Sequence, residues 1–216
     1  MIVLAIDAAL GGFSAAVTRD LEPLAVKQLP GNVALEQGLA AVASVLHEAG
    51  LTPSAVDRLA VGIGPGSFTG VRIAISYAKS LALGWQRPLV GVNSFDALEA
   101  GAALPEPLLA AVRGRKGVVS VRYRSGGAQH RASGYVNDVL DELSIAGGRI
   151  AVIGDAEDVL PGLAERGCSV QILDRAFTPS ALAVASVAAV REPARSSHEI
   201  RADYGELPAA KVPKHL

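Results

Sequence analysis

The glycine-rich segment 62–72 holds the residue types best suited to binding an anion. It follows an apolar stretch, and three of its glycines, Gly64, Gly66 and Gly70, allow backbone conformations that other residues avoid. A strand, a glycine turn and a helix in this order can bind a phosphate through backbone N–H groups. The same turn can instead seat one stretch of backbone tightly against another, and neither Gly-x-Gly-x-x-Gly nor Gly-Lys-Ser/Thr is present. Both interpretations stay open from the pattern alone.

Asp7 is a second candidate, because it ends an apolar run and precedes a glycine turn. A carboxylate placed there can hold a metal-bound phosphate, usually beside a Thr or Ser hydroxyl. Here Ala8 and Ala9 follow instead, and the first hydroxyl comes at Ser14. We therefore favour a carboxylate that accepts hydrogen bonds from the N–H groups of its own turn.

The residues that most often bind metals or act as nucleophiles form no recognisable pattern. The four histidines, at positions 47, 130, 198 and 215, lack the three-to-five-residue spacing of a local zinc pair. Cys168 is the single cysteine and follows the pattern of a small buried side chain. The chain lacks a Gly-x-Ser-x-Gly element and a paired acid and base. We expect no catalytic residue and no metal site.

Positive charge gathers between Pro107 and Asn137, where Asp and Glu are missing from the sequence. Because residues two apart in a strand share a face, Arg122 and Arg124 are predicted to lie together on an outer face. The segment suits contact with RNA phosphates or an acidic partner. It equally suits a solvated face on an edge strand. Its cationic residues are Arg113, Arg115, Lys116, Arg122, Arg124 and Arg131.

Composition limits the class of protein. Half of the 216 residues are hydrophobic but only 4% are aromatic, so a core of Ala, Val, Leu and Ile in α/β layers is expected. The net charge of −1 does not indicate nucleic-acid binding by itself. A single cysteine fits a reducing compartment. The longest apolar run, 181–190, is far shorter than the roughly 20 residues that span a bilayer. These features together predict a cytoplasmic protein without a membrane partner.

Apolar periodicity predicts the same order of strands and helices in two successive halves. In the first half, strands are predicted at 2–6, 13–18, 24–29, 59–63 and 89–92, and helices at 31–49, 70–83 and 94–100. After a linker at 101–107, strands follow at 108–112, 118–123, 128–132, 149–153 and 169–173, and helices at 136–143, 156–166 and 179–190. We predict a domain at 1–103, a smaller domain at 104–178, and a helix with a tail at 179–216 that returns to the first domain.

Two helices of the first half have faces that suggest a subunit interface. Leu35, Leu39, Val42 and Leu46 form one apolar stripe. Alanines at 74, 78 and 82 leave a smooth ridge that another helix can approach closely.

The chain resembles the TsaB (YeaZ) family, whose members are paralogues of the tRNA-modifying TsaD protein, in the glycoprotease (M22-like) group. The resemblance is carried by Leu4–Asp7, by Gly64–Ile73 with its Gly-Pro-Gly-Ser-Phe-Thr-Gly-x-Arg run, by Ala78–Ala82 and by Pro88–Ser94. It is strong over about residues 1–100. The chain departs from the family's pattern at Ala8, where Thr is usual, and at 34–40, where the histidines that hold a metal in the catalytic paralogue are missing.

The resemblance implies an actin-like ATPase (ASKHA, hexokinase/Hsp70-like) fold of class α/β, with two domains that each hold a mixed sheet flanked by helices. It implies a non-catalytic scaffold subunit without a cofactor of its own, whose degenerate nucleotide site is at Asp7, Ala8 and Ser14. The partners would be TsaD and the ATPase TsaE, which would carry ATP and metal, in the synthesis of N6-threonylcarbamoyladenosine (t6A) beside the tRNA anticodon. Alone, the chain would form a homodimer, and tRNA would be met through the complex.

The implied partner interface combines the two helix faces with the glycine-rich segment. Its residues are Leu35, Leu39, Val42, Leu46, Gly66, Phe68, Thr69, Val71, Arg72, Ala74, Ile75 and Ala78. Two other classes remain open: an ATP-dependent phosphotransferase of the sugar-kinase type, and an M22-type metallopeptidase.

Overall fold

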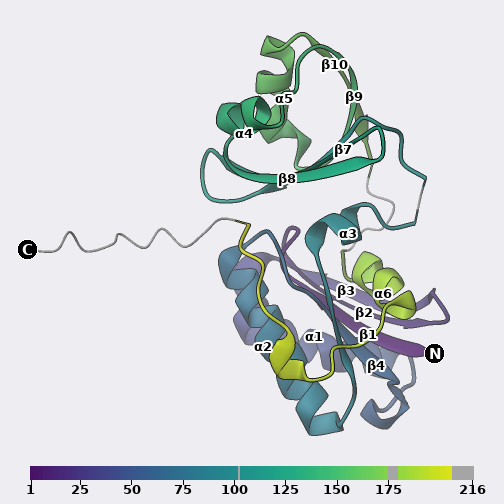
Figure 1. Cartoon of the computed structure of the whole chain (residues 1–216). Helices are drawn as coiled ribbons and strands as arrows, with labels where there is room; N and C mark the ends of the chain where they lie inside the picture. The colour runs from purple at the N-terminus through teal and green to yellow at the C-terminus, as the bar shows by residue number, and fades with distance from the viewer. Residues whose placement is uncertain (102, 175–179, 206–216) are drawn as a thin grey trace, which may run out of the picture.

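The structure is a computed structural model that describes residues 1–101, 103–174 and 180–205. Its first sheet has the strand order β3-β2-β1-β4-β5 (Figure 1). The strands are β1 (Ile2–Asp7), β2 (Phe13–Arg19), β3 (Glu22–Leu29), β4 (Arg58–Gly62) and β5 (Leu89–Val92). β2 runs antiparallel to both of its neighbours, while β4 is parallel to β1 and β5. The sheet is therefore mixed, with the continuous apolar run of β1 at its centre.

The second sheet repeats this arrangement with the order β10-β9-β6-β7-β8. Its strands are β6 (Leu108–Arg113), β7 (Val118–Ser125), β8 (Ala128–Tyr135), β9 (Gly148–Gly154) and β10 (Cys168–Leu173). β7 is antiparallel to β6 and β8, and β9 is parallel to β6 and β10. The duplicated order of strands and helices predicted from the sequence is confirmed.

Helices cover the sheets on their faces and ends (Figure 1). They are α1 (Ala34–Glu48), α2 (Phe68–Trp85), α3 (Ser94–Leu98), α4 (Val136–Glu142), α5 (Ala156–Glu165) and α6 (Ser180–Val190), with 3-10 turns at 31–33, 53–55 and 197–199. α1 and α2 pack on one face of the first sheet, and α6 packs on β1, β2 and β4 from the other. No helix in the described ranges has the length and apolar character to cross a bilayer.

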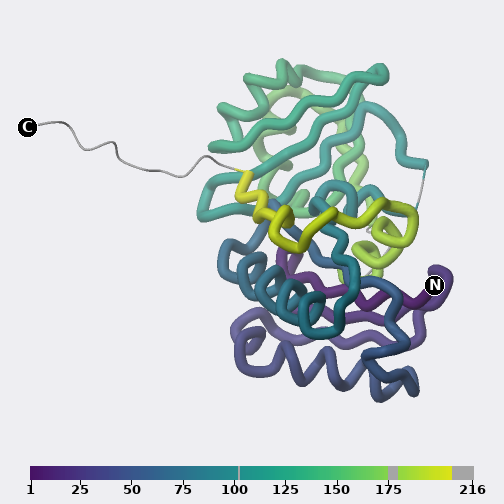
Figure 2. Tube along the Cα trace, turned by 60° about the horizontal axis from the view of Figure 1, so that its bottom comes forward, coloured from purple at the N-terminus to yellow at the C-terminus, as the bar shows by residue number. Residues whose placement is uncertain are grey.

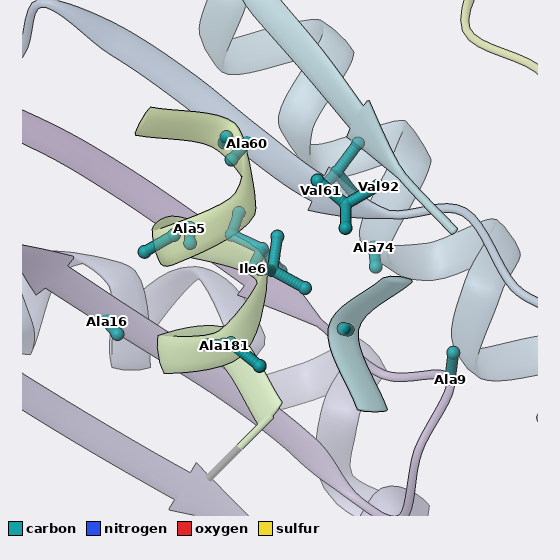
Figure 3. Close-up of a cluster of buried hydrophobic side chains, with 14 of the residues drawn as sticks. Ala5, Ile6, Ala9, Ala16, Ala60, Val61, Ala74, Val92 and Ala181 are labelled. Carbon is teal, nitrogen blue, oxygen red and sulfur yellow. The ribbon is translucent and has the colours of Figure 1, made fainter. Parts of the chain in front are cut away.

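The first lobe, meaning the first sheet with α1, α2, α3 and α6, has a core of small side chains. Figure 3 shows part of it, where alanines of β1, β2, β4, α2 and α6 lie among Ile6, Val61 and Val92. This agrees with the expected core of Ala, Val, Leu and Ile. The alanine ridge of α2 belongs to it, because Ala74 and Ala78 have no exposed surface. The prediction that this ridge meets a partner helix is therefore wrong: its close neighbour is the chain's own sheet.

The chain crosses between its two sheets more than once. Between β5 and β6 it forms α3, and after the second lobe (the second sheet with α4 and α5) it returns as α6. Residues 191–205, the C-terminal strap, then run beside β5 and α2 of the first lobe and reach the second lobe only at their end (Figures 1 and 2). Pro179, the predicted start of the last helix, and residues 206–216 of the predicted tail lie outside the described residues.

Candidate functional site

The glycine-rich turn between β4 and α2 packs against the turn that follows β1. A Cβ added at Gly66 would lie closer than 3.0 Å to the carbonyl oxygen of Ala9, and one at Gly70 equally close to that of Ala8. The Ser67 N–H donates to the Ala9 carbonyl at 3.1 Å. Of the two interpretations left open by the sequence, tight packing of backbone on backbone is the one that this geometry fits.

The C-terminal strap covers the same turn from another side. Gly64 has a φ of +93°, and a Cβ there would lie closer than 3.0 Å to the Asp203 carbonyl oxygen. The Asp203 N–H donates to the Ile63 carbonyl at 2.7 Å, and the Ser94 N–H donates to the Gly64 carbonyl at 2.8 Å. The turn is thus enclosed by segments of its own chain, which take the space beside its glycines.

Asp7 is buried at the end of β1, and its carboxylate is used inside the chain. Oδ2 accepts hydrogen bonds from the N–H groups of Ala9 and Leu10 at 3.3 and 3.2 Å, which confirms the predicted capping of its own turn. It also accepts one from the Ser180 hydroxyl at 2.6 Å. A Cβ at Gly62 would collide with the other carboxylate oxygen. Asp7 therefore fixes the start of α6 to the end of β1.

Ser14 completes this buried network, and Ala8, which follows Asp7 in the chain, is buried as well. The Ser14 hydroxyl accepts from the Ala181 N–H at 3.1 Å and lies 3.2 Å from the Ser180 hydroxyl. No pattern in the sequence indicates Ser180, because it lies 173 residues from Asp7. Within the described residues, no three His, Cys, Asp or Glu side chains are grouped so that they could hold a metal ion.

The surface of α1 and the start of α2 keeps several exposed apolar side chains. Leu35 is 64% exposed, Leu39 48% and Phe68 56%, and Thr69 and Arg72 lie beside Phe68 in the open. We call these five residues the α1–α2 surface. They are the part of the predicted interface that a partner could reach.

The other predicted interface residues pack inside the chain, so the interface is corrected. Leu46 and Ile75 are only 6% and 8% exposed, and the remaining side chains are even less accessible. Gly66 is partly buried against Ala9. The buried set comprises Val42, Leu46, Val71, Ala74, Ile75 and Ala78. The apolar stripe of α1 is thus divided between a core-facing half and an exposed half.

Tyr204 of the strap extends the α1–α2 surface, a contact that the sequence did not indicate. Its ring packs on that of Phe68 with centroids 4.9 Å apart, and the Arg72 guanidinium lies 5.2 Å from the Phe68 centroid. Tyr204 itself is 42% exposed. An aromatic pair with a stacked cation is a common composition for protein-binding surfaces.

The basic residues of β7 do not form a solvated outer face, so the prediction that Arg122 and Arg124 lie on an outer face is wrong. Arg122 is only 5% exposed. Its Nη1 lies 2.6 Å from Asp96 and its Nε 2.7 Å from Glu99. Arg124 lies 2.9 Å from the same Glu99. The face that alternation predicted to be outside is covered by α3, which lies between the two lobes (Figure 1).

Several of the other basic residues also contact acidic or aromatic side chains of the same chain. Arg113 lies 2.6 Å from Asp158, and the Arg115 guanidinium lies over the Tyr135 ring. Arg131 lies over the Phe95 ring and 3.8 Å from Asp203. Lys116 is exposed. All four of these side chains are exposed, so their contact with RNA or an acidic partner stays a prediction.

Asp96 should make the stability of the protein depend on pH. Burial raises the pKa of its carboxyl, but hydrogen bonds and charge from Arg122 and Arg191 outweigh burial and lower the pKa below its usual 3.8. A carboxyl whose pKa is lowered in the folded state stabilises the protein at pH values above its unfolded-state pKa. This stabilisation is lost as the pH falls through the folded-state pKa. We expect Asp96→Asn to flatten the fall of Tm below about pH 5. An unchanged profile in thermal unfolding scans would contradict this.

A cavity of about 510 Å³ opens at the junction of the lobes. Pro65 of the glycine-rich turn, Phe95 of α3 and Asp203 of the strap line one side, and Arg131 and Ser133 of β8 line the other. Of the glycine-rich turn, Pro65 is the residue that lines this cavity.

The family model of TsaD, tRNA N6-adenosine threonylcarbamoyltransferase, matches residues 35–196, well over half of the chain. The chain belongs to the TsaD family. Within it, the chain is similar to proteins named TsaB. The Escherichia coli (strain K12) tRNA threonylcarbamoyladenosine biosynthesis protein TsaB is 38% identical over 102 residues, which are 47% of this chain and 44% of that protein. The chain spans about half the length of the curated TsaB relatives it matches.

Solved structures agree with this assignment to the TsaD family. YeaZ from Pseudomonas aeruginosa aligns with a TM-score of 0.66 and 27% identity over 94% of this chain and 99% of that one. An Acidaminococcus fermentans (R)-2-hydroxyglutaryl-CoA dehydratase component A, only 12% identical, covers 87% and 97% with a TM-score of 0.53, which shows the fold alone. The two mixed sheets flanked by helices are those of the actin-like ATPase fold, as predicted.

Proposed function

We propose that this chain is a non-catalytic scaffold subunit in the synthesis of t6A. It would pair with the TsaD transferase and with TsaE to support threonylcarbamoyl transfer to the adenosine 3′ of the anticodon, in the cytoplasm. The observation that carries the proposal is the enclosed glycine-rich turn, where Gly64, Gly66 and Gly70 meet backbone oxygens of their own chain. The names of the TsaB relatives support the pathway.

The enclosed turn favours a partner role over a phosphotransferase. In an actin-like phosphotransferase, the end of the first strand and the glycine turn would have to admit phosphate and metal. Here the Asp7 carboxylate accepts from Ala9, Leu10 and Ser180. Admitting a nucleotide phosphate there would require this network to open. ATP and metal are accordingly assigned to TsaD and TsaE, and tRNA contact to the assembled complex.

The α1–α2 surface is the proposed contact for TsaD. Its exposed leucines and Phe68 form an apolar face on adjoining helices, which suits packing against helices of a sister subunit with the same fold. In the absence of TsaD, the same face would support a homodimer, since a self-complementary apolar face can pair with its own copy.

The α1–α2 surface can be tested by charge insertion at Leu35 and Leu39. We expect the Leu35→Glu, Leu39→Glu double variant to fold, because both side chains are exposed, but to lose co-purification with TsaD from the same organism. It should also lose t6A formation in a reconstituted assay. The matched control is Ile172→Glu, an aliphatic residue of β10 with 58% exposure in the second lobe, which should retain both.

Two results would contradict the proposal. Undiminished TsaD pairing by the double variant would remove the α1–α2 surface as the contact. Binding of Mg-ATP by the isolated wild-type chain in calorimetry would favour the phosphotransferase, and metal-dependent peptide hydrolysis would favour the M22-type peptidase.

A further inference from the structure

Helix α3 lies at the junction of the lobes and presents its acidic residues to the second lobe. Asp96 is in its first turn, and Glu99 is its C-terminal cap. Both carboxylates bind the guanidinium of Arg122 from β7, whose side chain is 5% exposed. The same guanidinium lies 5.3 Å from the centroid of the Phe95 ring. A buried side chain of the second lobe is thus held by three side chains that follow the first sheet.

The contacts of Arg122 extend into a cluster with balanced charge. Arg124 bridges Glu99 and Glu106 at 2.9 and 3.0 Å. Arg191 of the strap reaches the second oxygen of Asp96 at 2.8 Å. We call this set the ionic cluster. Its members are Asp96, Glu99, Glu106, Arg122, Arg124 and Arg191, three cations and three anions.

The C-terminal strap joins the lobes a second time. Asp203 accepts a hydrogen bond from the Asn93 side chain at 2.7 Å and lies 3.8 Å from Arg131 of β8. Two residues later, a Cβ at Gly205 would lie closer than 3.0 Å to the Ser120 hydroxyl of β7. The end of the strap therefore contacts both lobes, at a point well beyond Arg191, the residue that the strap contributes to the ionic cluster.

These two connections oppose rotation of the lobes. Two-lobed proteins that close around a ligand do so by hinge motion, in which contacts across the junction must change. Separating Arg122 from its carboxylates would leave charges unpaired in a poorly solvated place, which costs more than separating exposed charges. The strap also passes close to β7, since a Cβ added at Gly205 would lie closer than 3.0 Å to the Ser120 hydroxyl.

We propose that the ionic cluster and the C-terminal strap lock the two lobes in one orientation, so that this protein acts as a rigid body that does not close around a ligand. The inference rests on contacts within the chain and holds whether or not the chain pairs with TsaD. It differs from the expectation for an ATPase of this fold, whose lobes would have to move.

The lock can be measured as the distance between one spin label in each lobe. Ala43 on α1 and Ala164 on α5 are exposed, so labels at Ala43→Cys and Ala164→Cys in a Cys168→Ser background should leave the fold intact. We expect double electron–electron resonance to give a single narrow distance distribution, unchanged by Mg-ATP. Two distances, or a shift with Mg-ATP, would overturn the proposal.

Variants distinguish the effect of the ionic cluster on the distance distribution from the effect of an exposed ion pair. Asp96→Asn with Glu99→Gln should lose the single narrow peak, while Arg113→Gln, which breaks an ion pair inside the second lobe, should keep it. If the double variant does not fold, Arg124→Gln is the substitute, because this side chain is 31% exposed and still bridges Glu99 and Glu106. A peak that stays narrow in the folded cluster variant would overturn the role of the ionic cluster.

Discussion

Replacing Arg122 by alanine is expected to lower the free energy of unfolding by about 3–5 kcal/mol. The substitution leaves Asp96 and Glu99 facing a cavity without their shared partner, and the side chain of Glu99 is only 10% exposed. It also removes the guanidinium from the Phe95 ring. Arg191 and Arg124 still touch the two carboxylates, so the loss should fall toward the lower end of that range. Urea unfolding followed by circular dichroism at neutral pH measures the change.

Arg113→Ala is the matched control for this prediction. Arg113 also makes a short ion pair, 2.6 Å from Asp158, but its side chain is 56% exposed. Exposed pairs contribute at most about 1 kcal/mol, because water and salt screen them. A cost at Arg122 no larger than that at Arg113 would mean that the ionic cluster adds nothing beyond surface pairing.

Arg122 also illustrates what the sequence could and could not predict. Alternation along β7 correctly places Arg122 and Arg124 on one face of the strand. What covers that face is α3, and the acidic partners lie 23 to 26 residues away along the chain, with no local pattern linking them. The sequence therefore predicted the direction of the side chains but not their surroundings.

For the helices, too, the sequence predicted which residues share a face but not what that face contacts. The periodicity of α1 predicted an apolar face, yet Val42 and Leu46 pack on the chain's own sheet while Leu35 and Leu39 remain exposed. Strands were easier to predict, because apolar runs such as β1 are buried on both faces. The link from Asp7 to Ser180 depends on how α6 returns to the first sheet, and no spacing in the sequence encodes that return.

Two glycines on α2 should respond to alanine in opposite directions. At Gly84 an added Cβ meets nothing within 4 Å, so Gly84→Ala should stabilise the protein by up to about 1 kcal/mol through helix propensity. At Gly70 the same Cβ would lie closer than 3.0 Å to the Ala8 carbonyl oxygen, which belongs to backbone and cannot easily move. We expect Gly70→Ala to destabilise by about 1–3 kcal/mol, the usual cost of overpacking.

This pair of variants also tests what the glycine-rich segment is for. Both positions lie within one helix, so both variants gain helix propensity. The difference between their changes in the free energy of unfolding therefore measures the contact of position 70 with Ala8. If the role of Gly70 were to admit a phosphate, Gly70→Ala should stabilise the ligand-free protein as Gly84→Ala does, since an empty site has room for a methyl group. If the role of Gly70 is close packing against Ala8, Gly70→Ala should destabilise the protein even when no ligand is present. Thermal and urea unfolding of the two variants therefore decide between the two interpretations, and a Gly70→Ala variant more stable than wild type would argue against the enclosed turn on which the scaffold role depends.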